Sequence, residues 1–155
     1  MTQMTKNFSL AELTKSETAL RLSIENQPDD EQLNNLLLLC ANVLQPVRDH
    51  FGKGVKVNSA LRTIPVNRAV GSSDGSHHVK GMAADIEIPG VPNATLAEYI
   101  RDNLPHTQII LEFYTQGIPD SGWVHVSYDP QNLKHQSLTA IKKDGKTVYL
   151  EGIQA

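Results

Sequence analysis

The chain has little of what disulfide-rich, membrane-spanning and nucleic-acid-binding proteins need. Cys40 is the only cysteine among 155 residues, so no disulfide can form within the chain. The longest apolar run, residues 36–41, is far too short to cross a bilayer. The net charge of −3 favours neither nucleic acid nor anionic lipid, and the first ten residues lack the apolar core of a secretory signal. We therefore expect a protein that is synthesised in the cytoplasm, binds no nucleic acid and does not insert into membranes.

The length and the composition are typical of one globular domain. Domains commonly contain roughly 100–200 residues, so we expect residues 1–155 to form a single domain. An apolar fraction of 39% is sufficient for a hydrophobic core without disulfide staples. Cys40 lies in an apolar helical stretch, which indicates a buried structural thiol rather than a reactive one. We expect the protein to act as a monomer.

Helix signals dominate the first third of the chain. Ser9 and Glu12 form a capping box that starts a short helix, and Ser16 can cap a second one. The longest predicted helix lies within residues 28–51, where apolar residues recur at three- and four-residue steps. Pro46 lies inside this pattern and predicts a kink.

Strand signals dominate the rest. Alternating or apolar segments predict strands at residues 55–59, 84–88, 108–113 and 123–128. Thr95 and Glu98 are predicted to cap a helix between the second and third of these strands. Asp144-Gly145 is a strong type I′ turn signal for a C-terminal hairpin. Because helices come first and strands later, we expect an α+β fold with N-terminal helices packed on a mostly antiparallel sheet.

Three side chains have the chemistry of a catalytic zinc site. His78 is predicted in a loop, Asp85 in the strand that follows it, and His125 in the strand at residues 123–128. Catalytic zinc commonly takes three such ligands and keeps a fourth position for water. One anionic ligand leaves the ion net positive, so the ion can still acidify that water. These residues are therefore candidates to bind one zinc ion per chain.

The neighbouring residues indicate space for a substrate and a general base. Gly81, Ala83 and Asp85 share one face if this segment is extended, which would leave room beside the carboxylate for a substrate chain. The strands at residues 108–113 and 123–128 are separated by a connection of hairpin length, which places Glu112 opposite or nearly opposite His125. Glu112 is therefore a candidate general base.

Structural roles compete with these assignments. Single histidines in strands and glutamates at strand ends are commonly structural or solvated, so spacing alone leaves both interpretations of the site open. We interpret four other histidines as structural, and His77 is among them because the adjacent His78 fits the ligand spacing better. The remaining three are His50, His106 and His135.

Two motifs resemble those of the M15 family of zinc peptidases. The first is Ser76-x-His78-x-x-Gly81-x-Ala83-x-Asp85, and the second is Trp123-Val-His125-Val. The family comprises D-alanyl-D-alanine carboxypeptidase and dipeptidase relatives and includes phage endolysins. Segments further upstream are similar to its compact phage-type branch, so the resemblance extends over roughly residues 7 to 130.

The resemblance implies roles for particular residues. It implies zinc ligation by His78, Asp85 and His125, and substrate binding by an arginine that precedes the first ligand, which Arg62 matches. A planar guanidinium suits a carboxylate in a bidentate pair, although a surface arginine is the alternative interpretation. Ser76 could orient the adjacent ligand, contact substrate or only form a turn.

The sequence departs from the family at one catalytic position. Several members carry their catalytic glutamate three residues before the last histidine, where this chain has Gly122. Glu112 is our substitute for that base, and Ala83 stays a candidate substrate contact beside Arg62 and Ser76.

The resemblance implies hydrolysis of peptidoglycan amide bonds that involve D-amino acids, by carboxypeptidase or endopeptidase action. Without a secretory signal, the protein would reach the wall by phage-type release or as part of a virion. A non-catalytic wall-binding or virion structural module that keeps the metal site is the first alternative. A cytosolic D,D-dipeptidase is the second.

Overall fold

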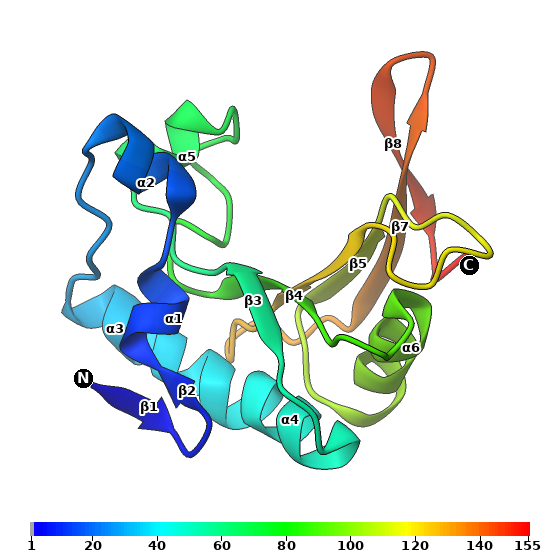
Figure 1. The fold of residues 1–155 in the computed structure, drawn as a ribbon, viewed down its shortest axis with the longest axis horizontal. Coiled ribbons are helices and arrows are strands. Elements are labelled where there is room, and N and C mark those ends of the chain that lie inside the picture. The colour runs from blue at the N-terminus through cyan, green and yellow to red at the C-terminus, as the bar shows by residue number, and fades with distance from the viewer. Residues whose placement is uncertain (1) are drawn as a thin grey trace.

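The computed structural model describes residues 2–155 and contains one large sheet with helices packed against it (Figure 1). The helices are α1 (Leu10–Thr14), α2 (Glu17–Leu22), α3 (Asp30–Leu39), the π-helical turn η1 (Cys40–Leu44), α4 (Gln45–Phe51), α5 (Ile64–Ala69) and α6 (Asn93–Asn103). The strands are β1 (Gln3–Thr5), β2 (Phe8–Ser9), β3 (Lys56–Ser59), β4 (Ala83–Glu87), β5 (Gln108–Glu112), β6 (Trp123–Ser127), β7 (Gln136–Lys143) and β8 (Lys146–Glu151).

The main sheet has the strand order β3-β4-β6-β5-β7-β8. Every neighbouring pair in it is antiparallel except β5 and β7, which are parallel. The N-terminal helices and α6 lie on either side of the β3–β4 region in Figure 1, and the β7–β8 hairpin projects away from them. The predicted α+β class with a mostly antiparallel sheet is therefore confirmed.

The three central strands β4, β5 and β6 have two chemically different faces. The back face is fully buried and apolar, and it consists of Ala84, Ile86, Ile109, Leu111, Val124 and Val126. It joins one core with residues of α3, η1 and α6, including Leu36, Val43 and Ile100. Cys40 belongs to this core, and burial raises the pKa of its thiol to about 12. The prediction of a buried structural cysteine is therefore confirmed.

Local sequence signals explain most helix ends. The capping box of Ser9 and Glu12 is present, and Ser16 caps α2. The long helix begins after Asp29 but contains the π turn η1 directly before Pro46. Proline has no N–H to donate and crowds the carbonyl four residues earlier, so a local change in helical hydrogen bonding accommodates it. The irregularity predicted at Pro46 is a π turn.

The predicted cap of α6 is wrong. The helix begins at Asn93 with Pro92 at the N-cap, and neither Thr95 nor Glu98 caps it. The buried Asn93 amide instead donates to the carbonyls of Ser121 and Gly122 at 3.0 and 3.2 Å. Tertiary contacts to this loop therefore determine where the helix starts.

The turn between β7 and β8 has the predicted form. Asp144 and Gly145 have φ values of 54° and 77°, and left-handed conformations at both central residues define a type I′ turn. Among residues 2–155, no helix is long and apolar enough to cross a membrane.

Candidate metal centre and its cleft

Three side chains from two strands and a loop converge on the front face, which is the opposite side of β4, β5 and β6 from the apolar core. Asp85 of β4 pairs directly with His125 of β6, and its Oδ1 lies 3.0 Å from His125 Nδ1. His78 reaches the same oxygen from the preceding loop, with Nε2 at 3.3 Å. One possible ligand atom from each residue lies within 4.8 Å of the others. The structure thus brings together the three residues predicted as zinc ligands.

Hydrogen bonds fix the orientation of this cluster. His78 is 2% exposed, and its Nδ1 lies 2.7 Å from the carbonyl oxygen of Ala60. That carbonyl can only accept, so Nδ1 donates to it and Nε2 faces Asp85. A backbone carbonyl behind a histidine ligand is a common support of metal sites.

The charge of the cluster suits a cation. Burial alone would raise the pKa of Asp85, but hydrogen bonds from His125 and His78 lower it well below its ordinary value. A carboxylate that stays ionised between two imidazoles is the donor set that zinc accepts. The residues present therefore fit a divalent transition-metal ion.

The loop that carries His78 is docked on helix α3. The side chains of Gln32 and Asn35 donate to the carbonyls of Val79 and Lys80 at 2.7 and 2.9 Å. Gly81 has a φ of 74°, and an added Cβ would lie 2.7 Å from the Gln32 carbonyl oxygen. This glycine permits close contact between the loop and the helix.

The structure does not have the extended segment through Gly81, Ala83 and Asp85 on which the predicted substrate space depended. Gly81 lies in a turn and does not continue strand β4. Ala83 is on the front face but is fully buried and does not line the cleft. Its methyl group has no exposed surface for a substrate to contact in this structure.

Glu112 lines the same cleft as the metal cluster. It pairs with Trp123 across β5 and β6, while Ile110 lies directly opposite His125, so Glu112 is diagonal to the histidine. Burial and then the negative charge of Asp85 raise the pKa of Glu112, and the charges of His125 and Arg62 lower it by smaller amounts. Among the described residues, the buried indole N–H of Trp123 meets no acceptor at hydrogen-bonding geometry. The Glu112 carboxylate is therefore a partly desolvated base.

Gly122, where the sequence departs from the family that it resembles, has no room for a side chain in this structure. Its φ is 66°, and an added Cβ would overlap the carbonyl oxygen of Glu112 and lie 2.8 Å from the carbonyl carbon of Phe113. No side chain fits there without a change in the backbone. The β5–β6 connection thus packs directly on the backbone of Glu112.

Two asparagines hold Arg62 in place. Asn26 lies far from it in the sequence, and the buried Asn67 lies five residues after it. Asn26 donates to the carbonyl of Leu61 at 3.0 Å and accepts from the N–H of Thr63 at 2.9 Å, so it binds the backbone on both sides of Arg62. Asn67 is fully buried and accepts from the Arg62 Nε at 3.1 Å. Burial lowers the pKa of Arg62, whereas Asp85 and Glu112 raise it. The guanidinium is consequently fixed beside the two carboxylates.

The cleft wall opposite the strands is a polar loop. Asn67 also donates to the carbonyl of Ser73 at 2.7 Å, and the Ser76 hydroxyl accepts from the N–H of His78 at 3.2 Å. Ser76 therefore contacts the backbone of His78, and it also lines the cleft. His77 lines the cleft as well, and burial followed by repulsion from His125 lowers its pKa.

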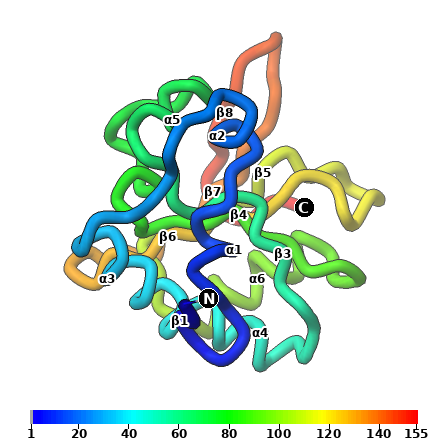
Figure 2. Tube along the Cα trace, turned by 60° about the vertical axis from the view of Figure 1, so that its left-hand side comes forward, coloured from blue at the N-terminus to red at the C-terminus, as the bar shows by residue number. Residues whose placement is uncertain are grey.

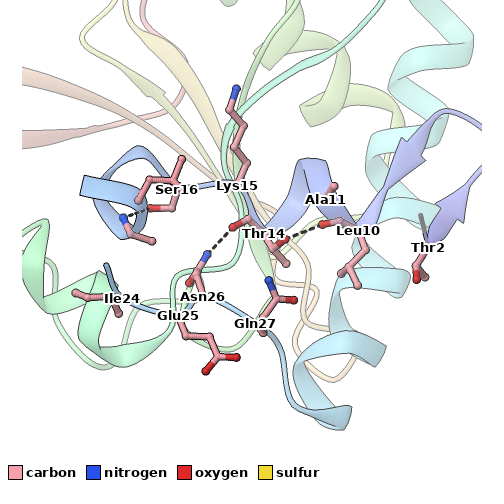
Figure 3. Close-up of a pocket in the computed structure, with 12 residues that line it drawn as sticks. Thr2, Leu10, Ala11, Thr14, Lys15, Ser16, Ile24, Glu25, Asn26 and Gln27 are labelled. Carbon is pink, nitrogen blue, oxygen red and sulfur yellow. Dashed lines mark hydrogen bonds between the residues drawn. The ribbon is translucent and has the colours of Figure 1, made fainter. Parts of the chain in front are cut away.

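The cleft measures about 460 Å³ and contains the whole constellation. A larger cavity of about 560 Å³ lies between α1 and the segment after α2, lined by Leu10, Ala11, Ile24 and Asn26 among others (Figure 3). None of the possible metal ligands lines it, and Asn26 already uses its amide to bind Thr14 and Leu61. The chemistry therefore belongs to the smaller cleft.

Sequence patterns missed three residues of this region. Asn26 and Asn67 carry no local signal because their partners lie elsewhere in the fold. Tyr149 of β8 lines the cleft although it lies 24 residues beyond His125. Only the order of strands in the sheet places it there.

Comparisons with known proteins agree with this geometry. A family model described as Peptidase M15 matches residues 6–127. No curated protein matches the chain. The matched segment includes the three candidate ligands, Glu112 and Arg62, and it ends before Tyr149.

Proposed function

The chain belongs to the peptidase M15 family of metallopeptidases, and from that premise we propose that it hydrolyses amide bonds beside D-amino acids in peptidoglycan stem peptides or crosslinks. One zinc ion per chain would be held by His78, Asp85 and His125. The observation that carries the proposal is that this cluster shares one cleft with a partly desolvated carboxylate, Glu112, and a fixed guanidinium, Arg62.

Each group has a distinct task in amide hydrolysis. A zinc ion supplies a Lewis acid that polarises the scissile carbonyl. Glu112 accepts a proton from the attacking water and delivers it to the leaving amine. Burial suits the first of these tasks, since a carboxylate with a raised pKa is a stronger base towards the attacking water.

Arg62 gives the substrate its direction. Its Nε is occupied by Asn67, so the two terminal nitrogens remain to bind a substrate carboxylate or carbonyl. The negative charges of Asp85 and Glu112 act on Arg62, so the cleft contains one positively charged side chain and two carboxylates that influence it. A peptide that ends in a carboxylate can place that group on Arg62 and its last amide bond between the cluster and Glu112.

The protein is proposed to act on the wall of a bacterial cell as a monomer, after phage-type release or as part of a virion. The test begins with the zinc content of the purified protein. Muropeptide release is then measured on walls of several chemotypes, with and without chelator. Asp85→Ala should abolish zinc binding and release, whereas Asp102→Ala, an exposed carboxylate on α6, should change neither.

The outcome also separates the alternatives. A zinc-loaded protein that releases nothing from any wall would refute the peptidase proposal. Wall binding without turnover would favour a non-catalytic module, for which the glycine at position 122 is the motivating observation. Cleavage of free D-Ala-D-Ala with no action on polymer would favour a D,D-dipeptidase.

A further inference from the structure

The C-terminal hairpin adds a wall to the cleft from outside the family-matched segment. Strand β7 pairs in parallel with β5, so Glu112 lies beside Ala140. Ala140 in turn pairs with Tyr149 of β8. Paired residues project from the same face of a sheet, so Glu112, Ala140 and Tyr149 form one row on the front face. The hairpin thus continues the floor of the cleft past Glu112.

The middle residue of this row leaves room above it. Ala140 is fully buried and has only a methyl group, whereas Tyr149 is 55% exposed and lines the cleft. Two strand spacings separate the backbones of Glu112 and Tyr149, which is about 10 Å. That width accommodates one extended peptide between the carboxylate and the phenol ring.

The base of the hairpin is rigid where Tyr149 lies. Thr139, which is 2% exposed, donates its hydroxyl to the carbonyl of Gly152 at 2.7 Å and accepts from the N–H of Gln154 at 2.8 Å. Residues 142–147, further along, are all exposed and bury nothing, and the hairpin projects beyond the rest of the chain in Figures 1 and 2. Tyr149 therefore stands at the fixed end of an otherwise solvent-exposed element.

Packing within the protein does not account for the Tyr149 side chain. Within residues 2–155, its hydroxyl makes no hydrogen bond and its ring stacks on no other aromatic ring, in contrast to Phe113 and Trp123, whose ring centroids are 5.5 Å apart. A large aromatic side chain held on a rigid strand binds ligands at a low cost in conformational entropy.

We propose that Tyr149 is a substrate-binding residue that packs its ring on the extended backbone of the peptide and donates its hydroxyl to a peptide carbonyl. The inference rests on the proposed function, because it takes the substrate to be a peptide that extends from the metal cluster past Glu112 to the hairpin. Small side chains such as the methyl group of D-alanine would fit above Ala140, and bulky ones would be excluded.

Binding without turnover is the first test. Zinc-loaded Glu112→Gln protein is titrated calorimetrically with a synthetic stem pentapeptide that ends in D-Ala-D-Ala. Adding Tyr149→Ala should weaken binding roughly tenfold and adding Tyr149→Phe roughly threefold, as for an aromatic contact with one hydrogen bond. Adding Thr147→Val, on the same face of β8 but outside the cleft, should change the Kd less than about twofold.

Kinetics in the otherwise unchanged protein complete the test. Tyr149→Ala should raise KM with kcat within about twofold, because the contact is made equally in the ground and transition states. If Tyr149→Ala turns over substrate with an unchanged KM and has the melting temperature of the parent, Tyr149 does not bind substrate. That result would not affect the proposed peptidase activity. Tyr149-dependent peptide binding without any turnover would support the role and remove the activity.

Discussion

The two faces of strands β4, β5 and β6 are built from alternating residues of the same segments, yet one face serves stability and the other serves chemistry. On the back face, Ile86 and Leu111 are fully buried among apolar neighbours. On the front face, Asp85 and Glu112 are partly desolvated carboxylates on one cleft. Burial of apolar side chains stabilises the fold, whereas burial of a carboxylate costs free energy unless a partner offsets it. The comparison shows that the back face stabilises strands whose front face is arranged for chemistry.

The largest effect is expected from removing the charge of Glu112. Glu112→Gln keeps the size of the side chain but cannot accept the proton, so kcat should fall by about 10²–10⁴-fold. Steady-state hydrolysis of a stem peptide measures the loss, and zinc content should stay at one per chain. Glu151→Gln, an exposed carboxylate on β8 outside the cleft, is the matched control.

The same variant tests whether the ionised carboxylate of Glu112 on the front face destabilises the fold. The pKa of Glu112 is raised in the folded protein, so its ionisation opposes folding, and the loss of stability grows as pH rises through the raised value. The Gln variant should therefore be at least as stable as the parent at pH 7. A clear loss of stability in chemical denaturation would show that the carboxylate stabilises the fold, and would contradict the contrast between the faces.

The back face should respond in stability and leave the chemistry intact. Ile86→Ala leaves a cavity in the core beneath Asp85 and Glu87, and should lower the free energy of unfolding by about 2–5 kcal/mol. Chemical denaturation measures this loss. The folded variant should bind zinc with unchanged stoichiometry. Ile118→Ala, at a position 51% exposed, should cost less than about 0.5 kcal/mol.

The junction of the two faces is tested at Gly122. Gly122→Ala should lower the free energy of unfolding by about 2–4 kcal/mol, since the new methyl group overlaps the backbone of Glu112 and strains a left-handed residue. Gly117→Ala is the control, because it also has positive φ, at 88°, but meets open space. Its cost should be about 1 kcal/mol from backbone conformation alone. Equal losses in the two variants would refute the close approach as the cause.

The smallest effect is expected at the rim of the front face. Arg62→Lys keeps the charge but loses the planar fork, so KM for a peptide with a free carboxylate should rise roughly tenfold. Arg68→Lys, in an exposed ion pair with Asp74, should leave KM unchanged. An unaltered KM in the Arg62 variant would assign this residue to structure and remove it from substrate binding.

Much of the fold follows from signals between near neighbours in the chain. Alternation in the segment around Asp85 predicts both a strand and its two faces, and the type I′ turn at Asp144-Gly145 depends only on adjacent residues. The wrong cap predicted at Thr95 shows that signals between near neighbours do not determine every helix start. There, the buried Asn93 amide, bound to a loop nearly 30 residues away, sets the helix start.

The convergence of His78, Asp85 and His125 is the part of the site that residue types and spacing predicted, and the structure places their ligand atoms together. Spacing could not show that Ala83 is fully buried, because burial depends on what packs over a residue. Nor could it show the clamp on Arg62. The hydrogen bonds that Asn26 donates to the backbone and that Asn67 accepts from Arg62 leave no periodic trace in a sequence.

By itself, the sequence determined the longer helices, the strands of the main sheet and the two faces of β4, β5 and β6, because periodicity, caps and tight turns act over a few residues. Only the tertiary structure decided how the site is completed. The parallel pairing of β5 and β7 carries Tyr149 to the cleft, and Gly122 packs on the backbone of Glu112. These contacts join residues that the sheet order brings together. They depend on which strands pair. That pairing is determined by the burial of the whole back face and not by any local pattern.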